Sequence, residues 1–407
     1  MRQETTSKPE IKYDLQIKFG SVYGREEEEA LLEVFRAGAP TSGNVSVQFE
    51  RDFAAYCGAK HARAVSNGTA ALFLALVALD VKPGDRVLTT PLTWIATAAV
   101  GTTLGAEVDF VDIDPVTYNL DPNQLEKKLT PNTKAVLPVH LYGQICDMDE
   151  INALADRHGF AVVEDACHAV GAEYKGRKAG HLGTFGCFSF HEQKNMSTLG
   201  EGGMVVTDDD GLFERVALYR SHCARVYGES TKYCRIDEAA HPQGKRFWFQ
   251  DFDDTGYNFR LTDIQAAVGI VQLRKLDSLN EQRNRNAEYL TSKLASIPGL
   301  KLPTTKPDRT HAYHLYPVLL DEKEFGMTRD DLIYELYNRY GIKVGTHYGA
   351  LHLTTAYRKR GFRKGQFPVA ERVSESIITL PVNPTKTAEA FDYLAASLAE
   401  LSHSGRS

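Results

Sequence analysis

Short β-rich runs alternate with helical patterns from about residue 60 to residue 210, and this alternation constrains the fold more than any other feature of the chain. Seven strands are expected, at residues 62–66, 86–90, 107–112, 135–141, 161–165, 186–190 and 204–207. Helices are expected between them, at residues 69–79, 94–104, 123–129, 148–158 and 212–219. The pattern is typical of an α/β fold in which helices cover a mostly parallel sheet. Ligands of such sheets bind beyond the carboxyl ends of the strands.

The remaining sequence predicts a second, smaller unit. A chain of 407 residues is too long for one small core, and its rhythm changes after residue 210. We therefore expect a large domain over residues 1–260 and a smaller C-terminal α+β domain over residues 261–407. Residues 221–252 form a polar and aromatic insertion, which is typical of a lid or of an arm that reaches a neighbouring subunit. The smaller domain is expected to contain helices at 261–276, 279–296, 329–340 and 388–401, and strands at 312–320 and near 344–348.

Composition and charge exclude several classes of function. The formal net charge of -6 and the lack of a long basic run argue against a nucleic-acid partner. The first residues lack the apolar stretch of a signal peptide, and no apolar run of about 18 residues follows, so we expect a cytoplasmic protein that does not cross a membrane. The six cysteines contain no Cys-x-x-Cys pair, so no metal site is expected.

Lys194 is the first candidate for chemistry. It follows the expected strand at residues 186–190 in a polar turn, and the Gly-Glu-Gly-Gly sequence at residues 200–203 then leads into the next strand. A lysine amine attacks a carbonyl carbon when burial or a neighbouring charge lowers its pKa, because only the neutral amine is nucleophilic. Most lysines are exposed and take no part in catalysis, so this residue alone does not decide the function.

Two earlier strand ends carry residues that suit a flat, phosphorylated ligand. Gly68 and Thr69 lie at the start of an expected helix, where free backbone amides bind phosphate, although the same sequence is also a good helix cap. Trp94 follows the strand at residues 86–90, and its indole suits stacking on a heteroaromatic ring or packing in the core.

A further strand end carries a carboxylate and a histidine. Glu164 and Asp165 alternate across the strand at residues 161–165, so only one of them faces the ligand side. Asp165 suits a charge-assisted hydrogen bond to a protonated ring nitrogen, and His168 follows three residues later. Each of these residues alone is also compatible with a structural role. Together with Lys194, however, the phosphate cradle, the aromatic ring and the carboxylate are the parts that pyridoxal phosphate requires.

With these motifs in order, the chain resembles the DegT/DnrJ/EryC1/StrS family of sugar aminotransferases, which are fold type I enzymes that use pyridoxal phosphate. The likeness extends from about residue 17 to residue 401. It is carried by the motifs at residues 66–72, 93–97, 139–144, 164–168, 189–203 and 256–263. The resemblance implies that the large domain binds the cofactor on a mostly parallel seven-stranded sheet.

The resemblance also implies two catalytic residues. Lys194 would form the internal aldimine and move the proton between the cofactor and the substrate carbon. Asp165 would pair with the pyridine nitrogen and keep the ring electron-withdrawing. Trp94 would stack on the ring, and His168 would lie near its phenolic oxygen.

Four further residues would hold the cofactor phosphate, according to the same resemblance. Gly68, Thr69 and Ser189 would bind the phosphate within one subunit. Asn258 would reach the phosphate of the partner subunit. The resemblance therefore implies a homodimer with the active site at the subunit interface.

The implied reaction moves an amino group from glutamate or glutamine to a keto-sugar. A nucleotide-linked sugar is the leading expectation, and a free keto-cyclitol such as an inosose is the alternative. Some relatives are sugar dehydratases with histidine at the lysine position, and Lys194 argues against that activity. A cofactor-binding regulator without turnover is a further alternative. His347 and Tyr348 lie in a segment that lines the substrate side in the family, and Arg225 in the polar insertion suits a diphosphate or a solvated surface.

Overall fold

A seven-stranded sheet forms the centre of the computed structural model, which describes residue 10 and residues 20–38, 42–224 and 252–404. Its strand order is β1-β9-β8-β5-β4-β2-β3, and β9 alone runs antiparallel to its neighbours. The strands are β1 (His61–Val65), β2 (Arg86–Thr89), β3 (Glu107–Phe110), β4 (Thr133–Leu137), β5 (Ala161–Asp165), β8 (Phe185–Ser189) and β9 (Gly203–Thr207). The predicted α/β class and the mostly parallel seven-stranded sheet are confirmed.

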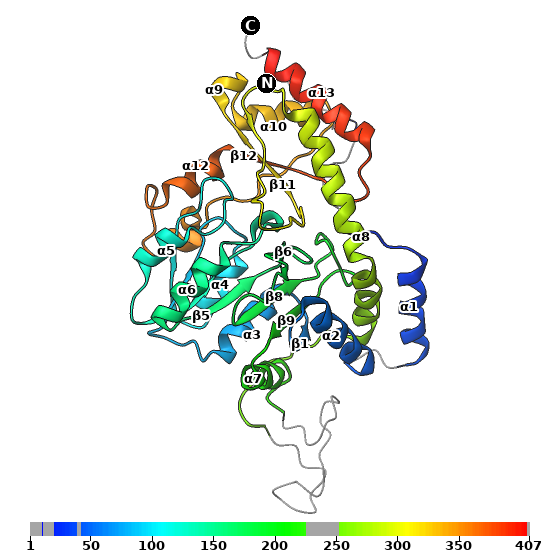
Figure 1. Cartoon of the computed structure of the whole chain (residues 1–407), viewed down its shortest axis with the longest axis vertical. Helices are drawn as coiled ribbons and strands as arrows, with labels where there is room; N and C mark the ends of the chain where they lie inside the picture. Colours follow the sequence, from blue (N-terminus) through cyan, green and yellow to red (C-terminus); the bar gives the residue numbers. More distant parts are fainter. Residues whose placement is uncertain (1–9, 11–19, 39–41, 225–251, 405–407) are drawn as a thin grey trace, which may run out of the picture.

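Helices cover both faces of this sheet (Figure 1). One face packs against α2, α5, α6 and the first half of α8, and the other packs against α3, α4 and α7. Burial on both faces explains why the strands read as apolar runs rather than as alternating patterns. The helices are α2 (Asn44–Cys57), α3 (Gly68–Ala78), α4 (Ala96–Thr103), α5 (Pro122–Lys128), α6 (Met148–His158) and α7 (Asp210–Arg220), with α1 (Arg25–Arg36) packed against α8. Short elements between them are η1 (Leu141–Gly143), β6 (Glu173–Tyr174) and β7 (Arg177–Lys178).

The second core is built on a three-stranded antiparallel sheet. It comprises β10 (Leu300–Lys301), β11 (Tyr316–Leu320) and β12 (Ile377–Leu380), together with α9 (Glu322–Phe325), α10 (Arg329–Asn338) and α13 (Ala388–Ser404). The segment between α10 and β12 contains η2 (Leu351–Leu353), α11 (Thr355–Arg358) and α12 (Pro368–Ser376). No helix in the described part of the chain is both long enough and apolar enough to cross a membrane.

Helix α8 (Asp263–Leu294) connects the two cores. The two helices predicted at 261–276 and 279–296 are one continuous helix, so the predicted interruption is wrong. The polar residues at that point keep partners without leaving the helix: Ser278 donates to the Lys275 carbonyl at 2.8 Å, and Asp277 accepts from Tyr56 at 2.6 Å. Early residues of α8 pack in the large core and late residues in the small one. A division into domains at residue 260 stays a proposal. It assigns the whole of α8 to the smaller unit, although the early residues of this helix pack in the large core.

Two predicted strands of the smaller unit differ from the structure. Strand β11 begins at Tyr316 rather than at residue 312, because the preceding backbone bonds the large unit, with the Ala312 amide donating to the Gly143 carbonyl at 2.9 Å. The strand predicted near 344–348 is reduced to an isolated bridge between Gly345 and Thr379.

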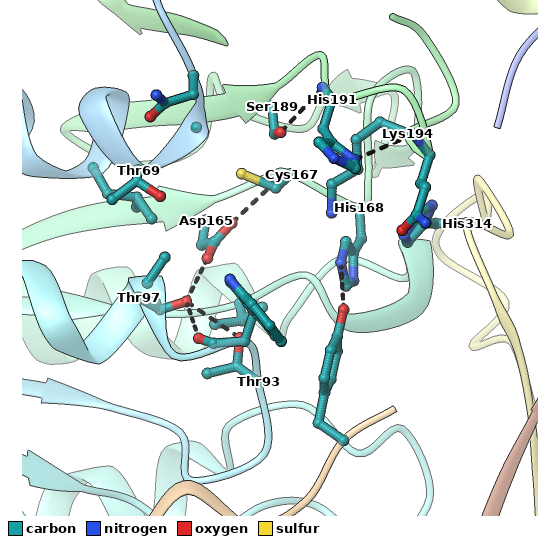
Figure 2. Close-up of a pocket in the computed structure, with 18 of the residues that line it drawn as sticks. Thr69, Thr93, Thr97, Asp165, Cys167, His168, Ser189, His191, Lys194 and His314 are labelled. Atoms are coloured by element: carbon teal, nitrogen blue, oxygen red, sulfur yellow. Dashed lines mark hydrogen bonds between the residues drawn. The ribbon is translucent and has the colours of Figure 1, made fainter. Parts of the chain in front are cut away.

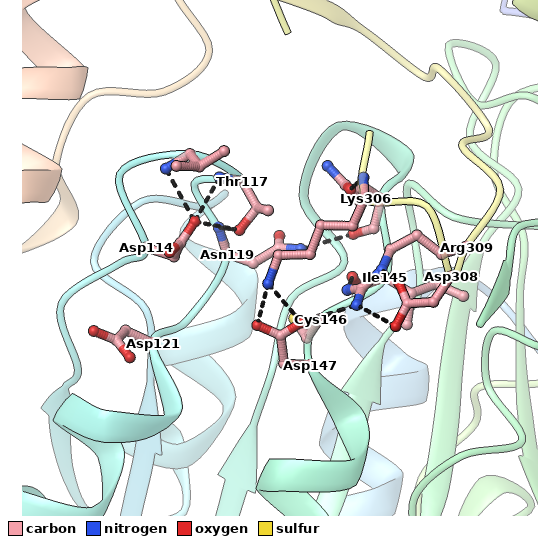
Figure 3. Close-up of polar contacts among 12 residues, drawn as sticks. Asp114, Thr117, Asn119, Asp121, Ile145, Cys146, Asp147, Lys306, Asp308 and Arg309 are labelled. Atoms are coloured by element: carbon pink, nitrogen blue, oxygen red, sulfur yellow. Dashed lines mark hydrogen bonds and ion pairs between the residues drawn. The ribbon is translucent and has the colours of Figure 1, made fainter. Parts of the chain in front are cut away.

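An ion-pair cluster fastens the segment before β11 to the large unit (Figure 3). Asp147 accepts hydrogen bonds from Lys306 at 2.9 and 2.7 Å and from Arg309 at 2.9 Å. Arg309 also donates to the Ile145 carbonyl at 2.6 Å, and its side chain is only 2% exposed. The segment held in this way leads directly to His314, which lines the cavity described next.

Candidate active site

A cavity of about 1050 Å³ lies at the carboxyl ends of the parallel strands and receives residues from both cores. Most of the predicted site residues line it: Gly68, Thr69, Trp94, Asp165, His168, Ser189, Lys194, His347 and Tyr348. Asn258 is described and exposed, and it is not part of the lining. Arg225 lies outside the described residues. The structure thus brings together side chains from strand ends that are far apart in the sequence (Figure 2).

The start of α3 forms an anion cradle at one end of the cavity. Asn67 caps the helix by accepting from the Ala70 amide at 2.8 Å, and the first-turn amides at Gly68 and Thr69 have no partner within the helix. A Cβ atom at Gly68 would lie 2.7 Å from the Ser189 Cβ, so only glycine lets the helix start this close to the end of β8. Free amides, a hydroxyl and the helix dipole together suit a phosphate group.

Asp165 ends β5 and is 6% exposed. Its Oδ2 accepts a hydrogen bond from the Thr97 hydroxyl at 2.7 Å, and its Oδ1 accepts one from the Cys167 amide at 3.2 Å. Sequence reasoning missed Thr97, although the residue belongs to the Thr-Trp-Ile-Ala-Thr motif that was singled out. The available signal was the spacing of Thr97 four residues after Thr93, which in the structure brings their two hydroxyls to 3.2 Å of each other.

The preceding residue, Glu164, points away from the cavity. It is fully buried, pairs with His140 at 2.8 Å and accepts the amides of Leu182 and Gly183, each at 2.7 Å. Strand alternation therefore divides the two carboxylates between a structural network and the cavity.

Lys194 lies in the turn after β8, half-buried in the cavity wall. Its amide donates to the His191 carbonyl at 2.8 Å, and the neighbouring Glu192 carbonyl accepts the Gly20 amide at 2.7 Å. The N-terminal segment thus holds this turn from outside. Desolvation by the surrounding protein lowers the pKa of the Lys194 ammonium, which favours the neutral, nucleophilic amine.

His168 is held between the two units. Its Nδ1 accepts from the Tyr142 amide at 3.3 Å, and its Nε2 lies 3.2 Å from the Tyr348 hydroxyl. Burial lowers the pKa of the imidazole well below its ordinary value, so the ring is neutral. Trp94 lies near Tyr348, with 6.3 Å between the centroids of the two rings. The tryptophan is 63% exposed.

These residues fit pyridoxal phosphate. The cradle at Gly68 suits the phosphate, the Asp165 carboxylate suits a protonated ring nitrogen, and the exposed Trp94 indole suits a flat ring. Lys194 supplies an amine of lowered pKa to the same cavity. Because ligand cavities range from roughly 300 to 1,000 Å³, this cavity has room for the cofactor and a second molecule.

Comparisons with known proteins agree with this site. The sequence profile of the DegT/DnrJ/EryC1/StrS aminotransferase family matches residues 22–399. The spore coat polysaccharide biosynthesis protein SpsC of Bacillus subtilis (strain 168) is 40% identical over 372 residues, which are 91% of this chain and 92% of that protein.

Solved structures of similar proteins cover nearly the whole chain. DesV of S. venezuelae, in complex with a ketimine intermediate, is 35% identical with a TM-score of 0.82, over 93% of this chain and 94% of that one. PseC of Helicobacter pylori, an aminotransferase involved in the biosynthesis of pseudoaminic acid, is 28% identical with a TM-score of 0.85, over 96% and 100%. The chain therefore belongs to the DegT/DnrJ/EryC1/StrS aminotransferase family, whose enzymes depend on pyridoxal phosphate.

Proposed function

We propose that the protein is a sugar aminotransferase that moves an amino group from glutamate or glutamine to a keto-sugar. The observation that carries the proposal is the placement of Lys194 and Asp165 on one cavity with a phosphate cradle beside them. The relatives SpsC and PseC, which serve polysaccharide and pseudoaminic acid biosynthesis, support a sugar acceptor.

Lys194 and Asp165 are the proposed catalytic residues. Pyridoxal phosphate, when bound, supplies an electron sink for negative charge on the substrate carbon. Asp165 keeps the ring nitrogen protonated through a charge-assisted hydrogen bond, and Thr97 and the Cys167 amide orient its carboxylate. Lys194 would hold the cofactor through its amine and, as the free amine, would move the proton at the substrate carbon.

The remaining cofactor contacts orient the ring. Gly68, Thr69 and Ser189 would bind the phosphate at the start of α3, and Trp94 would stack on the ring face. His168 would lie near the ring's phenolic oxygen. This division of roles is supported by the common lining of the cavity and by the sheet order, in which β8, ending at Ser189, is the neighbour of β5, ending at Asp165.

We further propose a homodimer in which Asn258 reaches the phosphate of the partner subunit. Its neighbours Tyr257 and Phe259 line the cavity of their own chain, whereas Asn258 is exposed and outside the lining. Side chains alternate in an extended segment, so Asn258 faces away from its own site and is available to a second copy.

The proposed acceptor side is formed by His347 and Tyr348. The His347 ring is fixed by a contact of 2.7 Å to the Thr379 hydroxyl, and both His347 and Tyr348 line the cavity. A nucleotide-linked keto-sugar is the proposed acceptor, since the cavity volume exceeds the cofactor's needs and Arg225 of the polar insertion suits a diphosphate. A keto-cyclitol is the second candidate.

The absorbance spectrum tests the reaction. The purified enzyme with pyridoxal phosphate is mixed with glutamate and, separately, with glutamine. Loss of the visible band and growth of the shorter-wavelength band of the aminated cofactor identify the donor. If the visible band is present and neither donor changes it, the proposed donors are wrong.

The acceptor is then searched with the aminated enzyme. Nucleotide-linked keto-sugars and keto-cyclitols are added one at a time, and return of the visible band reports transfer. A keto-cyclitol that reacts far faster than every nucleotide sugar would overturn the proposed acceptor class while the aminotransferase assignment stands.

A further inference from the structure

Tyr142 connects the two units at the edge of the cavity. The residue lies in η1, is 1% exposed, and packs in a hydrophobic cluster that includes Leu315 and Ile377 from the second core. Its hydroxyl donates a hydrogen bond of 2.6 Å to the backbone carbonyl of His347. Its backbone amide donates to His168 at 3.3 Å. One residue therefore bonds both the histidine beside Lys194 and the loop that carries Tyr348.

These bonds determine where the hydrogen atoms of the neighbouring groups lie. A ring nitrogen that accepts a hydrogen bond carries no hydrogen, so the Nδ1 of the neutral His168 is bare and its Nε2 carries the N–H. That N–H donates to the Tyr348 oxygen at 3.2 Å. Within the described part of the chain, His168 is the one hydrogen-bond partner of the Tyr348 hydroxyl. Because the Tyr348 oxygen accepts this bond, the hydroxyl hydrogen of Tyr348 is not used in it. Because Tyr348 lines the cavity, the free hydrogen is available to a ligand there.

We propose that Tyr142 is a positioning residue that directs the Tyr348 hydroxyl into the cavity, where Tyr348 donates a hydrogen bond to an oxygen of the keto acceptor. The proposal rests on the aminotransferase function proposed above. Tyr142 acts through both of its bonds: its amide sets the tautomer of His168, and its hydroxyl holds the His347–Tyr348 backbone at the cavity wall.

Tyr118 provides a matched control. Its ring lies 6.3 Å from that of Tyr142, and the residue is 2% exposed in the same cluster. Unlike the Tyr142 hydroxyl, its hydroxyl is buried and has no hydrogen-bond partner among the residues that the structure describes. Replacing either tyrosine by phenylalanine removes the same oxygen atom from the same core, but only the change at Tyr142 breaks a bond to the substrate loop.

The test compares Tyr142→Phe, Tyr118→Phe, Tyr348→Phe and the double variant Tyr142→Phe/Tyr348→Phe. The Kd of the acceptor for the aminated enzyme and the kcat/KM for the acceptor are measured, with the rate of the donor half-reaction as a reference. Loss of one hydrogen bond predicts that Tyr142→Phe weakens acceptor binding by roughly tenfold while the donor half-reaction changes little. Tyr118→Phe is expected to match the wild type.

The double variant separates positioning from general damage. If Tyr142 acts through Tyr348, the double variant is no worse than Tyr348→Phe alone. The proposal would be overturned if the losses of acceptor affinity in the two single variants multiplied in the double variant. It would also be overturned if Tyr142→Phe bound and used the acceptor as well as Tyr118→Phe does.

A second readout does not depend on turnover. Nitrogen-15 shifts of His168, assigned with a His168→Gln variant, are expected to show hydrogen on Nε2 in the wild-type protein. Hydrogen on Nδ1 would contradict the proposed geometry even in an active enzyme. A wild-type enzyme that reacts with no donor or acceptor would instead defeat the proposed function, and the tautomer would still decide whether Tyr142 sets the hydrogen positions.

Discussion

The Thr97 hydroxyl donates a hydrogen bond of 2.7 Å to Asp165, and this contact joins the first turn of α4 to the end of β5. It occupies Oδ2, while the Cys167 amide occupies one lone pair of Oδ1. A carboxylate fixed at both oxygens has one orientation toward the cavity. The ring nitrogen of the cofactor is therefore expected to meet a carboxylate that needs no rearrangement.

Thr97→Val tests the value of this orientation. Valine keeps the shape of threonine but removes the donor, so Asp165 loses a charge-assisted hydrogen bond worth roughly 1.5–3 kcal/mol. We expect the donor half-reaction, followed by stopped-flow absorbance, to slow by about tenfold or more. Thr102→Val is the control, since the Thr102 hydroxyl bonds the Ala98 carbonyl within α4 at 3.2 Å, lies 3.5 Å from the Tyr357 hydroxyl, and does not belong to the cavity lining. Equal rates for both variants would show that Thr97 has no part in the chemistry.

Gly68→Ala tests the phosphate cradle. The added methyl group would lie 2.7 Å from the Ser189 Cβ and 3.1 Å from the Cys167 Sγ, so the start of α3 must move away from β8. Such overpacking costs about 1–3 kcal/mol, and we expect the Kd for pyridoxal phosphate to rise by roughly tenfold. Gly211→Ala is the control because a Cβ there meets nothing closer than 3.4 Å. Unchanged cofactor affinity in Gly68→Ala would argue against a cradle at this helix.

The lowered pKa of Lys194 predicts a pH dependence of the cofactor-free protein. The folded state binds the proton less tightly than the unfolded state, whose lysine has the ordinary pKa of 10.5. Between the two pKa values the unfolded state binds more protons, so stability rises with pH in that window. Below the folded-state pKa, Lys194 is charged in both states, and the desolvation of its ammonium lowers the free energy of unfolding by the full amount.

This effect is isolated by comparison with Lys194→Met. The free energy of unfolding in urea is measured for both proteins from neutral pH to about pH 10.5. The wild-type protein is expected to gain stability relative to the variant as pH rises through the folded-state pKa of Lys194. Two curves that stay parallel over this range would contradict the desolvation of Lys194.

Asp147→Asn tests the cluster that fastens the segment before β11 (Figure 3). Asp147 receives three hydrogen bonds from Lys306 and the buried Arg309. Without its negative charge, the buried guanidinium of Arg309 loses one of its ion-pair partners. We expect a loss of roughly 1–3 kcal/mol in the free energy of unfolding. Asp149→Asn is the control, because its partner Lys175 is exposed and surface pairs contribute little. A loss no larger in Asp147→Asn than in Asp149→Asn would show that the cluster does not stabilise the fold.

The large unit was predictable because its signals are local. Parallel strands buried on both faces appear as apolar runs, and the motif residues that follow them converge at one sheet edge by topology alone. The sequence therefore predicts that Gly68, Asp165 and Lys194 belong to one site.

Contacts between distant segments were not predictable in the same way. In the continuous α8, Asp277 accepts a hydrogen bond from Tyr56 of α2, which is 221 residues away in the sequence. The early start predicted for β11 failed because Gly143 takes the Ala312 amide. Thr97 and Tyr142 act through tertiary hydrogen bonds to Asp165 and to the His347 carbonyl, partners that lie far away in the sequence.

The central claim, that Lys194 is the lysine that holds pyridoxal phosphate, is tested most directly by reduction of the loaded enzyme with borohydride, followed by peptide mass mapping. Lys343 also lines the cavity and serves as an internal comparison. We expect the reduced cofactor on Lys194 alone, and we expect its yield to fall sharply when glutamate or glutamine is added before the reductant. A label on Lys343, or a label on Lys194 that no amino donor diminishes, would contradict the account.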